Sequence, residues 1–120
     1  MARILLADDD AATRELVQRA LAMDGHDVVV TQDGAEALER LEAGGGRIDL
    51  LISDVQMPGV DGIDLVEKGL VASPGLRIIL MSGFSGELTR AEHLKPKISR
   101  VISKPFTLEQ MRAVVKGVLG

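Results

Sequence analysis

Three consecutive acids follow a short apolar run near the start of the chain, in "ILLADDD" (residues 4–10). Asp8, Asp9 and Asp10 place like charges a few ångströms apart, and such carboxylates repel unless one keeps its proton or a cation lies between them. Magnesium is a hard cation that takes oxygen ligands and usually keeps several waters. The acids therefore predict a divalent metal site where the apolar run ends.

Three further reactive side chains follow later apolar runs: Asp54, Ser82 and Lys104. A carboxylate can act as a nucleophile toward a phosphoryl group, forming an acyl phosphate. We expect Asp54 to be that nucleophile, with the Ser82 hydroxyl and the Lys104 ammonium stabilising the developing charge. We expect Asp9 and Asp54 to bind Mg²⁺ directly and Asp8 to act through water.

Short apolar runs alternate with amphipathic stretches along the whole sequence. This alternation predicts an α/β domain, a doubly wound parallel sheet of five strands with five helices, over residues 1–120. Such sheets bind ligands beyond the carboxyl ends of their strands. The reactive side chains all fall at such ends. The expected strands are 3–7, 26–32, 50–53, 77–81 and 100–103. The last three are continuously apolar, as strands covered by helices on both faces should be.

The first helix is predicted from its periodicity and its ends. Leu16, Val17, Ala20, Leu21 and Met23 recur at helical spacing. An acid at the start can cap free N–H groups, and a glycine at position 25 can end the helix. We assign Asp10 to this capping role, and Asp61 to the same role before a later helix.

Composition excludes several functional classes. The chain has no cysteine, which removes thiol catalysis, cysteine zinc sites and disulfides, and fits a cytoplasmic protein. The net charge is −4 with two Phe and no Tyr or Trp, so we expect no nucleic-acid contact. The first apolar run is too short for a signal peptide or a membrane span.

Four segments together resemble the receiver domains of two-component response regulators: "LLADDDAATR", "DVQMPGVDG" (54–62), "MSG" (81–83) and "KPF" (104–106). The resemblance covers the whole chain. It implies a flavodoxin-like (βα)5 fold with strand order 2-1-3-4-5. It also implies that the domain accepts a phosphoryl group rather than acting as an enzyme on other substrates.

The resemblance assigns a role to each site residue. It implies that Asp8 and Asp9 bind Mg²⁺, that Asp54 is phosphorylated, and that the backbone carbonyl of Gln56 is a further metal ligand. Ser82 would be the hydroxyl switch and Lys104 the phosphate partner. Receivers also tend to hold the Lys-Pro peptide bond cis, which we expect at residues 104–105.

The implied partners are proteins. A histidine kinase or histidine phosphotransfer protein would donate the phosphoryl group, and a downstream protein would respond. The opening and closing segments are most similar to stand-alone regulators of the CpdR type, which act as protease adaptors when unphosphorylated. A receiver cut from a larger regulator or hybrid kinase is an alternative.

Two further alternatives belong to other classes. A haloacid-dehalogenase-type phosphatase also uses an aspartyl phosphate, with its nucleophile at the first strand, which "DDDAAT" resembles. Ala12 stands where that family's pattern has Thr or Val, and its late pair of metal-binding acids is absent. A pseudo-receiver that only binds a partner would have no use for the acids.

The sequence departs from the receiver pattern in two places. Val101 occupies the position of the usual Tyr or Phe relay, so we expect a signal to travel by another route, with the loop at Phe84 as the hypothesis. The helix expected within 86–97 is short, with at most two turns before Pro96. His26 and His93 are expected to be surface residues without acidic partners.

Overall fold

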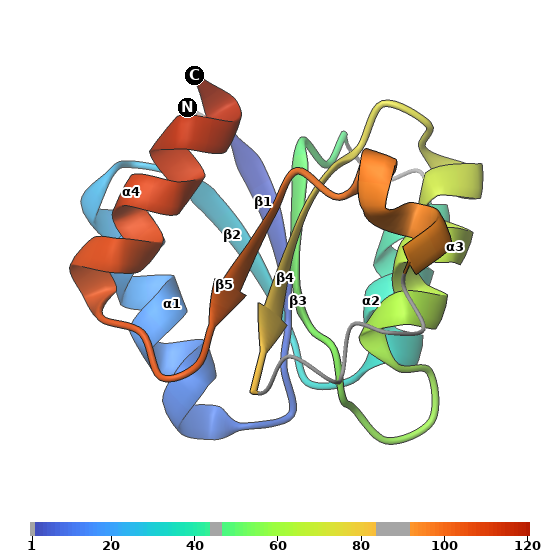
Figure 1. Ribbon diagram of the computed structural model, residues 1–120, viewed down its shortest axis with the longest axis horizontal. Coiled ribbons are helices and arrows are strands. Elements are labelled where there is room, and N and C mark those ends of the chain that lie inside the picture. Colours follow the sequence, from blue (N-terminus) through green and yellow to red (C-terminus); the bar gives the residue numbers. More distant parts are fainter. Residues whose placement is uncertain (1, 44–46, 84–91) are drawn as a thin grey trace.

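The computed structural model describes residues 2–43, 47–83 and 92–120. These residues form a five-stranded parallel sheet in the order β2-β1-β3-β4-β5. Helices α1 and α4 cover one face of the sheet and α2 and α3 cover the other (Figure 1). The predicted doubly wound fold and strand order are confirmed. The elements are β1 (Arg3–Ala7), α1 (Ala11–Met23), β2 (Asp27–Thr31), α2 (Gly34–Glu42), β3 (Leu50–Asp54), α3 (Gly62–Ala72), β4 (Arg77–Ser82), β5 (Arg100–Ser103) and α4 (Leu108–Leu119).

The three central strands divide their side chains between two apolar cores. On β1, Leu5 and Ala7 pack into the core under α2 and α3, whereas Ile4 and Leu6 pack into the core under α1 and α4. Successive side chains of a strand point to opposite faces, so a strand covered on both faces must be apolar at every position. This requirement explains the continuous apolar runs in the sequence.

Strand β5 does not follow that rule. Val101 is 39% exposed, Arg100 and Ser103 are also exposed, and only Ile102 is buried. The prediction that residues 100–103 form a strand covered on both faces is therefore wrong; in the sheet of the described residues, β5 is an edge strand paired with β4. Val101, which stands where the resemblance predicts a Tyr or Phe, therefore lies at the surface.

Side chains cap the helices as the sequence predicts. The Asp10 carboxylate accepts a hydrogen bond from the Thr13 N–H at the start of α1, and the Asp61 carboxylate accepts one from Asp64 at the start of α3. After α1, Gly25 has a φ of 76°, a left-handed conformation that favours glycine.

The buried face of α1 is narrower than its periodicity predicts. Val17, Ala20 and Leu21 are buried, and Leu16 is partly buried against the same core. Met23, however, is 55% exposed, at the last position of the helix.

A short 3₁₀ helix over residues 92–97 stands where the fourth helix is expected. It continues through Pro96, which the sequence interpretation placed beyond its end; the fixed φ of proline lies within the 3₁₀ range. The remainder of the expected helix, 86–91, and the proposed relay residue Phe84 lie outside the described residues. Among the helices of the described ranges, none is long and apolar enough to cross a membrane.

Candidate functional site

The predicted site residues converge at the carboxyl end of the sheet. Asp8 directly follows β1, Asp54 ends β3, Ser82 ends β4 and Lys104 directly follows β5. The strand order reverses between β1 and β3, which is where doubly wound sheets form a ligand-binding crevice. Residues up to 96 positions apart in the sequence are therefore neighbours.

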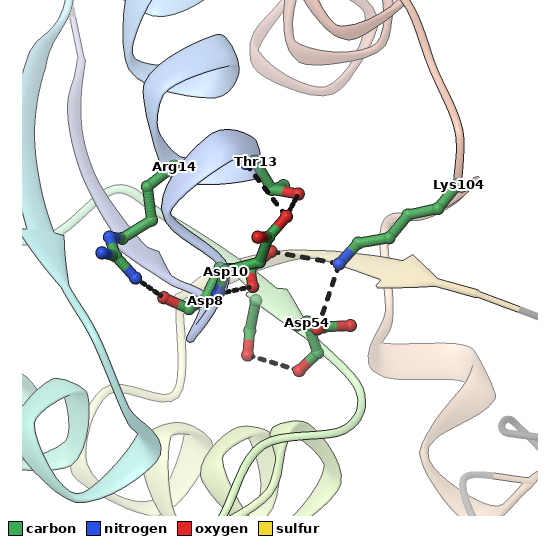
Figure 2. A network of polar contacts seen from close by, with 7 residues as sticks. Asp8, Asp10, Thr13, Arg14, Asp54 and Lys104 are labelled. Carbon is green, nitrogen blue, oxygen red and sulfur yellow. Dashed lines mark hydrogen bonds and ion pairs between the residues drawn. The ribbon is translucent and has the colours of Figure 1, made fainter.

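The Lys104 ammonium lies between two carboxylates. Its Nζ is 3.2 Å from Asp8 Oδ2 and 3.1 Å from Asp54 Oδ2, so it donates a charge-assisted hydrogen bond to each (Figure 2). The Lys104 backbone N–H donates to the Ser82 carbonyl at 2.7 Å, which ties the start of this loop to the end of β4. The Lys104–Pro105 peptide bond is cis, as predicted.

Three carboxylates form a cluster that fits a hard divalent cation. One oxygen each of Asp8, Asp9 and Asp54 lies within 4.8 Å of the others. Asp8 and Asp54 are buried, whereas Asp9 is exposed. An all-oxygen set with one exposed side suits Mg²⁺, which keeps part of its water shell. These are three of the predicted metal ligands.

Burial and the ion pairs shift two pKa values at the site. Burial raises the pKa of Asp8, although the Asp10 N–H and the Lys104 ammonium partly counteract it. Burial alone would lower the pKa of Lys104, but its hydrogen bond to Asp54 and the charges of Asp8 and Asp54 outweigh burial and raise it. Lys104 is therefore firmly cationic at neutral pH.

Ser82 and Gln56 occupy places consistent with the predicted site. Ser82 is 3% exposed and lies on β4, between the strands that bring Asp54 and Lys104. Gln56 is exposed, two residues beyond β3 in the loop that leads to α3. The loop of residues 55–61, between β3 and α3, thus leaves the sheet directly after Asp54 of the carboxylate cluster.

Sequence reasoning missed the groups that hold the Asp54 backbone. The Ser53 hydroxyl donates to the Asp54 carbonyl oxygen at 2.9 Å. Gly62 packs so closely against this carbonyl that any Cβ at position 62 would overlap it, and Gly34 approaches the Val60 carbonyl in the same way. Glycine in "VDG" reads as an ordinary turn signal, so the sequence offers no sign of these close approaches.

Arg14 is a second missed residue. Its Nη1 donates to the Asp8 carbonyl oxygen at 2.8 Å (Figure 2). The two histidines lie away from the cluster, but His93 is not without an acidic partner: its Nε2 is 3.2 Å from Glu67 of α3. That expectation is corrected, because the 3₁₀ helix packs beside α3. His26 Nδ1 accepts from the Ala2 N–H at 3.1 Å.

Comparison with known proteins agrees with this geometry. The family model described as "Response regulator receiver domain" matches residues 4–116. The response regulator receiver protein CpdR of Brucella abortus is 36% identical over 111 residues, covering 92% of this chain and 91% of CpdR. The response regulator MprA of Mycobacterium ulcerans is 33% identical over 98% of this chain, which spans only half the length of MprA.

A solved structure shows the same architecture. The response regulator protein TrrA of Thermotoga maritima, in complex with Mg²⁺ and BeF, is 28% identical, with a TM-score of 0.83 over 98% of this chain and 99% of that one. The chain therefore belongs to the response regulator receiver domain family.

Proposed function

We propose that this chain is a phosphoacceptor receiver, in which Asp54 takes a phosphoryl group from a phosphohistidine with the help of Mg²⁺. The observation that carries the proposal is the position of the Lys104 ammonium, 3.1 Å from Asp54 and 3.2 Å from Asp8. A cation fixed beside a carboxylate nucleophile can neutralise the charge that accumulates on a transferring phosphoryl group.

Accessibility favours Asp54 over Asp8 as the acceptor. Asp8 is fully buried, its Oδ1 accepts from the Asp10 N–H and its Oδ2 accepts from Lys104. Asp54 is 8% exposed at the end of its strand. An in-line attack needs an oxygen that an incoming phosphoryl group can reach. The same contrast argues against the dehalogenase-type phosphatase, whose nucleophile would be Asp8.

The carboxylate cluster supports the metal part of the proposal. Asp8, Asp9 and Asp54 would hold the ion, with the Gln56 carbonyl as a further ligand. Bound Mg²⁺ would offset the repulsion among the acids and the charge of the phosphoryl oxygens. Lys104 would hold a phosphoryl oxygen from the β5 side, and the Ser82 hydroxyl would donate to another.

We propose that residues 1–120 form one receiver domain whose output is contact with a downstream protein. The donor would be a histidine kinase or a histidine phosphotransfer protein. The 36% identity to CpdR supports a CpdR-like regulator with a protease-adaptor role as the finer hypothesis. The chain matches only half the length of MprA. A receiver that belongs to a larger regulator is therefore the second candidate.

The test is modification of the purified chain by acetyl phosphate with Mg²⁺, followed by intact mass and peptide mapping. We expect one phosphoryl group on Asp54, none in Asp54→Asn, and none when EDTA removes the metal. Asp8→Asn keeps Asp54 and should lose modification through loss of metal. Modification of Asp8 in the Asp54→Asn variant would instead favour the phosphatase class.

Partner choice is tested by comparing proteins captured with and without beryllofluoride, a mimic of the phosphoryl group. We expect at least one protein to bind in only one of the two states. Asp54→Asn, which cannot form the mimic complex, serves as the control. Identical capture in both states would contradict a phosphorylation switch.

A further inference from the structure

Arg14 approaches the loop of residues 8–10, which carries two of the proposed metal ligands, from the side opposite Lys104 (Figure 2). Its Nη1 donates to the backbone carbonyl of Asp8 at 2.8 Å, and its own backbone N–H donates to the Asp10 carbonyl at 3.0 Å in the first turn of α1. This contact of the guanidinium is made to a backbone carbonyl and not to a carboxylate oxygen. The guanidinium therefore binds the main chain that carries the cluster.

The two peptide groups on either side of Asp9 are both anchored. The Asp8–Asp9 peptide is held through its carbonyl by Arg14, and the Asp9–Asp10 peptide is held through its N–H by Asp8 Oδ1 at 2.9 Å. Peptide groups are planar, so fixing both leaves little freedom in the two dihedral angles of the residue between them. The Asp9 side chain is exposed, but its Cα–Cβ direction is set by these two bonds.

We infer that Arg14 is a positioning residue for the Mg²⁺ site: it orients the exposed ligand Asp9 through the Asp8 carbonyl. This inference rests on the proposed function, because it concerns the metal that function requires. Groups that orient metal ligands typically change metal affinity by about 10- to 100-fold when they are removed. Arg14 would supply such a contact from outside the cluster, by way of the main chain.

An electrostatic role and a positioning role of Arg14 predict opposite changes in Mg²⁺ affinity when Arg14 is replaced. This difference makes the inference testable. Removing a positive charge near a cation site strengthens cation binding, so a purely electrostatic Arg14 gives a variant with tighter Mg²⁺ binding. Removing an anchor loosens Asp9, so a positioning Arg14 gives weaker binding. The direction of the change decides between the two roles.

The experiment measures Mg²⁺ affinity by calorimetric titration of wild type, Arg14→Met, Arg14→Lys and Arg19→Met. Arg19 lies on the same helix, is exposed and pairs with Glu15, so Arg19→Met makes the same charge change away from the loop. We expect roughly 10-fold weaker binding in Arg14→Met, a smaller loss in Arg14→Lys, and a change below about 2-fold in Arg19→Met.

A second measurement concerns the metal-free protein and does not depend on phosphorylation. Hydrogen exchange of the Asp10 amide should be faster in Arg14→Met than in wild type, while amides of the central strands keep their protection. This pattern reports a loosened loop in a folded domain.

The outcomes separate the inference from the proposed function. Mg²⁺ binding by Arg14→Met that equals or exceeds that of wild type would overturn the inference and leave the receiver function standing. Global loss of amide protection in Arg14→Met would show a role in folding instead and would also overturn it. A wild-type chain that binds no Mg²⁺ would overturn the proposed function itself.

Discussion

The site is assembled from two unlike halves of the sheet. The acids come from β1 and β3, interior strands that are hydrogen-bonded on both sides. The lysine directly follows β5, a four-residue strand at the edge of the sheet that, within the described ranges, pairs with β4. The acid half also has anchors on its backbone, from Arg14, Ser53 and the close approach of Gly62.

The acid half, which the proposed function assigns to the metal, therefore has more backbone support than the lysine half, which it assigns to the phosphoryl group. Segments with few buried contacts open at lower free energy than the centre of a domain. If the proposed function holds, a structural change on phosphorylation should involve the β4–β5 side more than the β1–β3 side. The predictions below test this difference in support.

The largest expected effect is on stability, from truncating matched isoleucines in the two halves. Ile52 of β3 is fully buried, and Ile102 of β5 is 7% exposed at the sheet edge; both pack into the core under α1 and α4. We expect Ile52→Ala to lower the free energy of unfolding by about 4 kcal/mol and Ile102→Ala by about 2 kcal/mol, since the edge can relax around a cavity. Urea denaturation measures both, and equal losses would remove the proposed contrast.

The second prediction concerns the packing of Gly62 against the backbone carbonyl of Asp54. A methyl group at position 62 would overlap the Asp54 carbonyl, so Gly62→Ala should destabilise the fold by about 2 kcal/mol and weaken Mg²⁺ binding. Gly117 of α4 has open space around it, so Gly117→Ala is the matched control. It should stabilise the helix by up to about 1 kcal/mol. Thermal melts and Mg²⁺ titrations of the two variants provide the measurement. A Gly62→Ala variant that is as stable and binds Mg²⁺ as tightly as Gly117→Ala would contradict the prediction.

The smallest expected effect is a pH dependence that originates at Asp8. Its pKa is raised in the folded state, so the folded protein holds this proton more tightly than the unfolded chain, whose ordinary value is 3.8. The resulting stabilisation is fully present below pH 3.8 and is lost as the pH rises through the folded pKa. Asp8→Asn is neutral throughout, so its stability relative to wild type should increase as the pH rises from about 4 toward neutrality.

Urea midpoints in metal-free buffer across this pH range provide the measurement. Glu39→Gln removes a carboxylate at an exposed position of α2 and serves as the matched control. A difference between Asp8→Asn and wild type that stays constant with pH would contradict the role of burial at Asp8.

Much of this protein follows from local sequence rules. Alternating apolar runs and amphipathic segments predict the parallel sheet, and the acids before α1 and α3 predict their caps, because strand burial and helix capping are properties of neighbouring residues. The site residues could be named as well, since side chains that follow parallel strands share one edge of the sheet. The exposure of Val101 was mispredicted, because "RVIS" has the composition of a buried strand, and composition does not show which faces of that strand other elements cover.

Tertiary structure alone decided how the site is held. Lys104 reaches Asp8 and Asp54 because β5 runs parallel beside β4, 50 residues and more from either acid. Arg14 turns to a backbone carbonyl rather than a carboxylate, and Gly62 matters because a carbonyl lies against it. Sequence determines which groups exist and where each element begins. Distances, burial and backbone contacts at the site are set only when elements distant in the chain pack together. They join residues far apart in the sequence, and rules based on neighbouring residues do not describe such pairs.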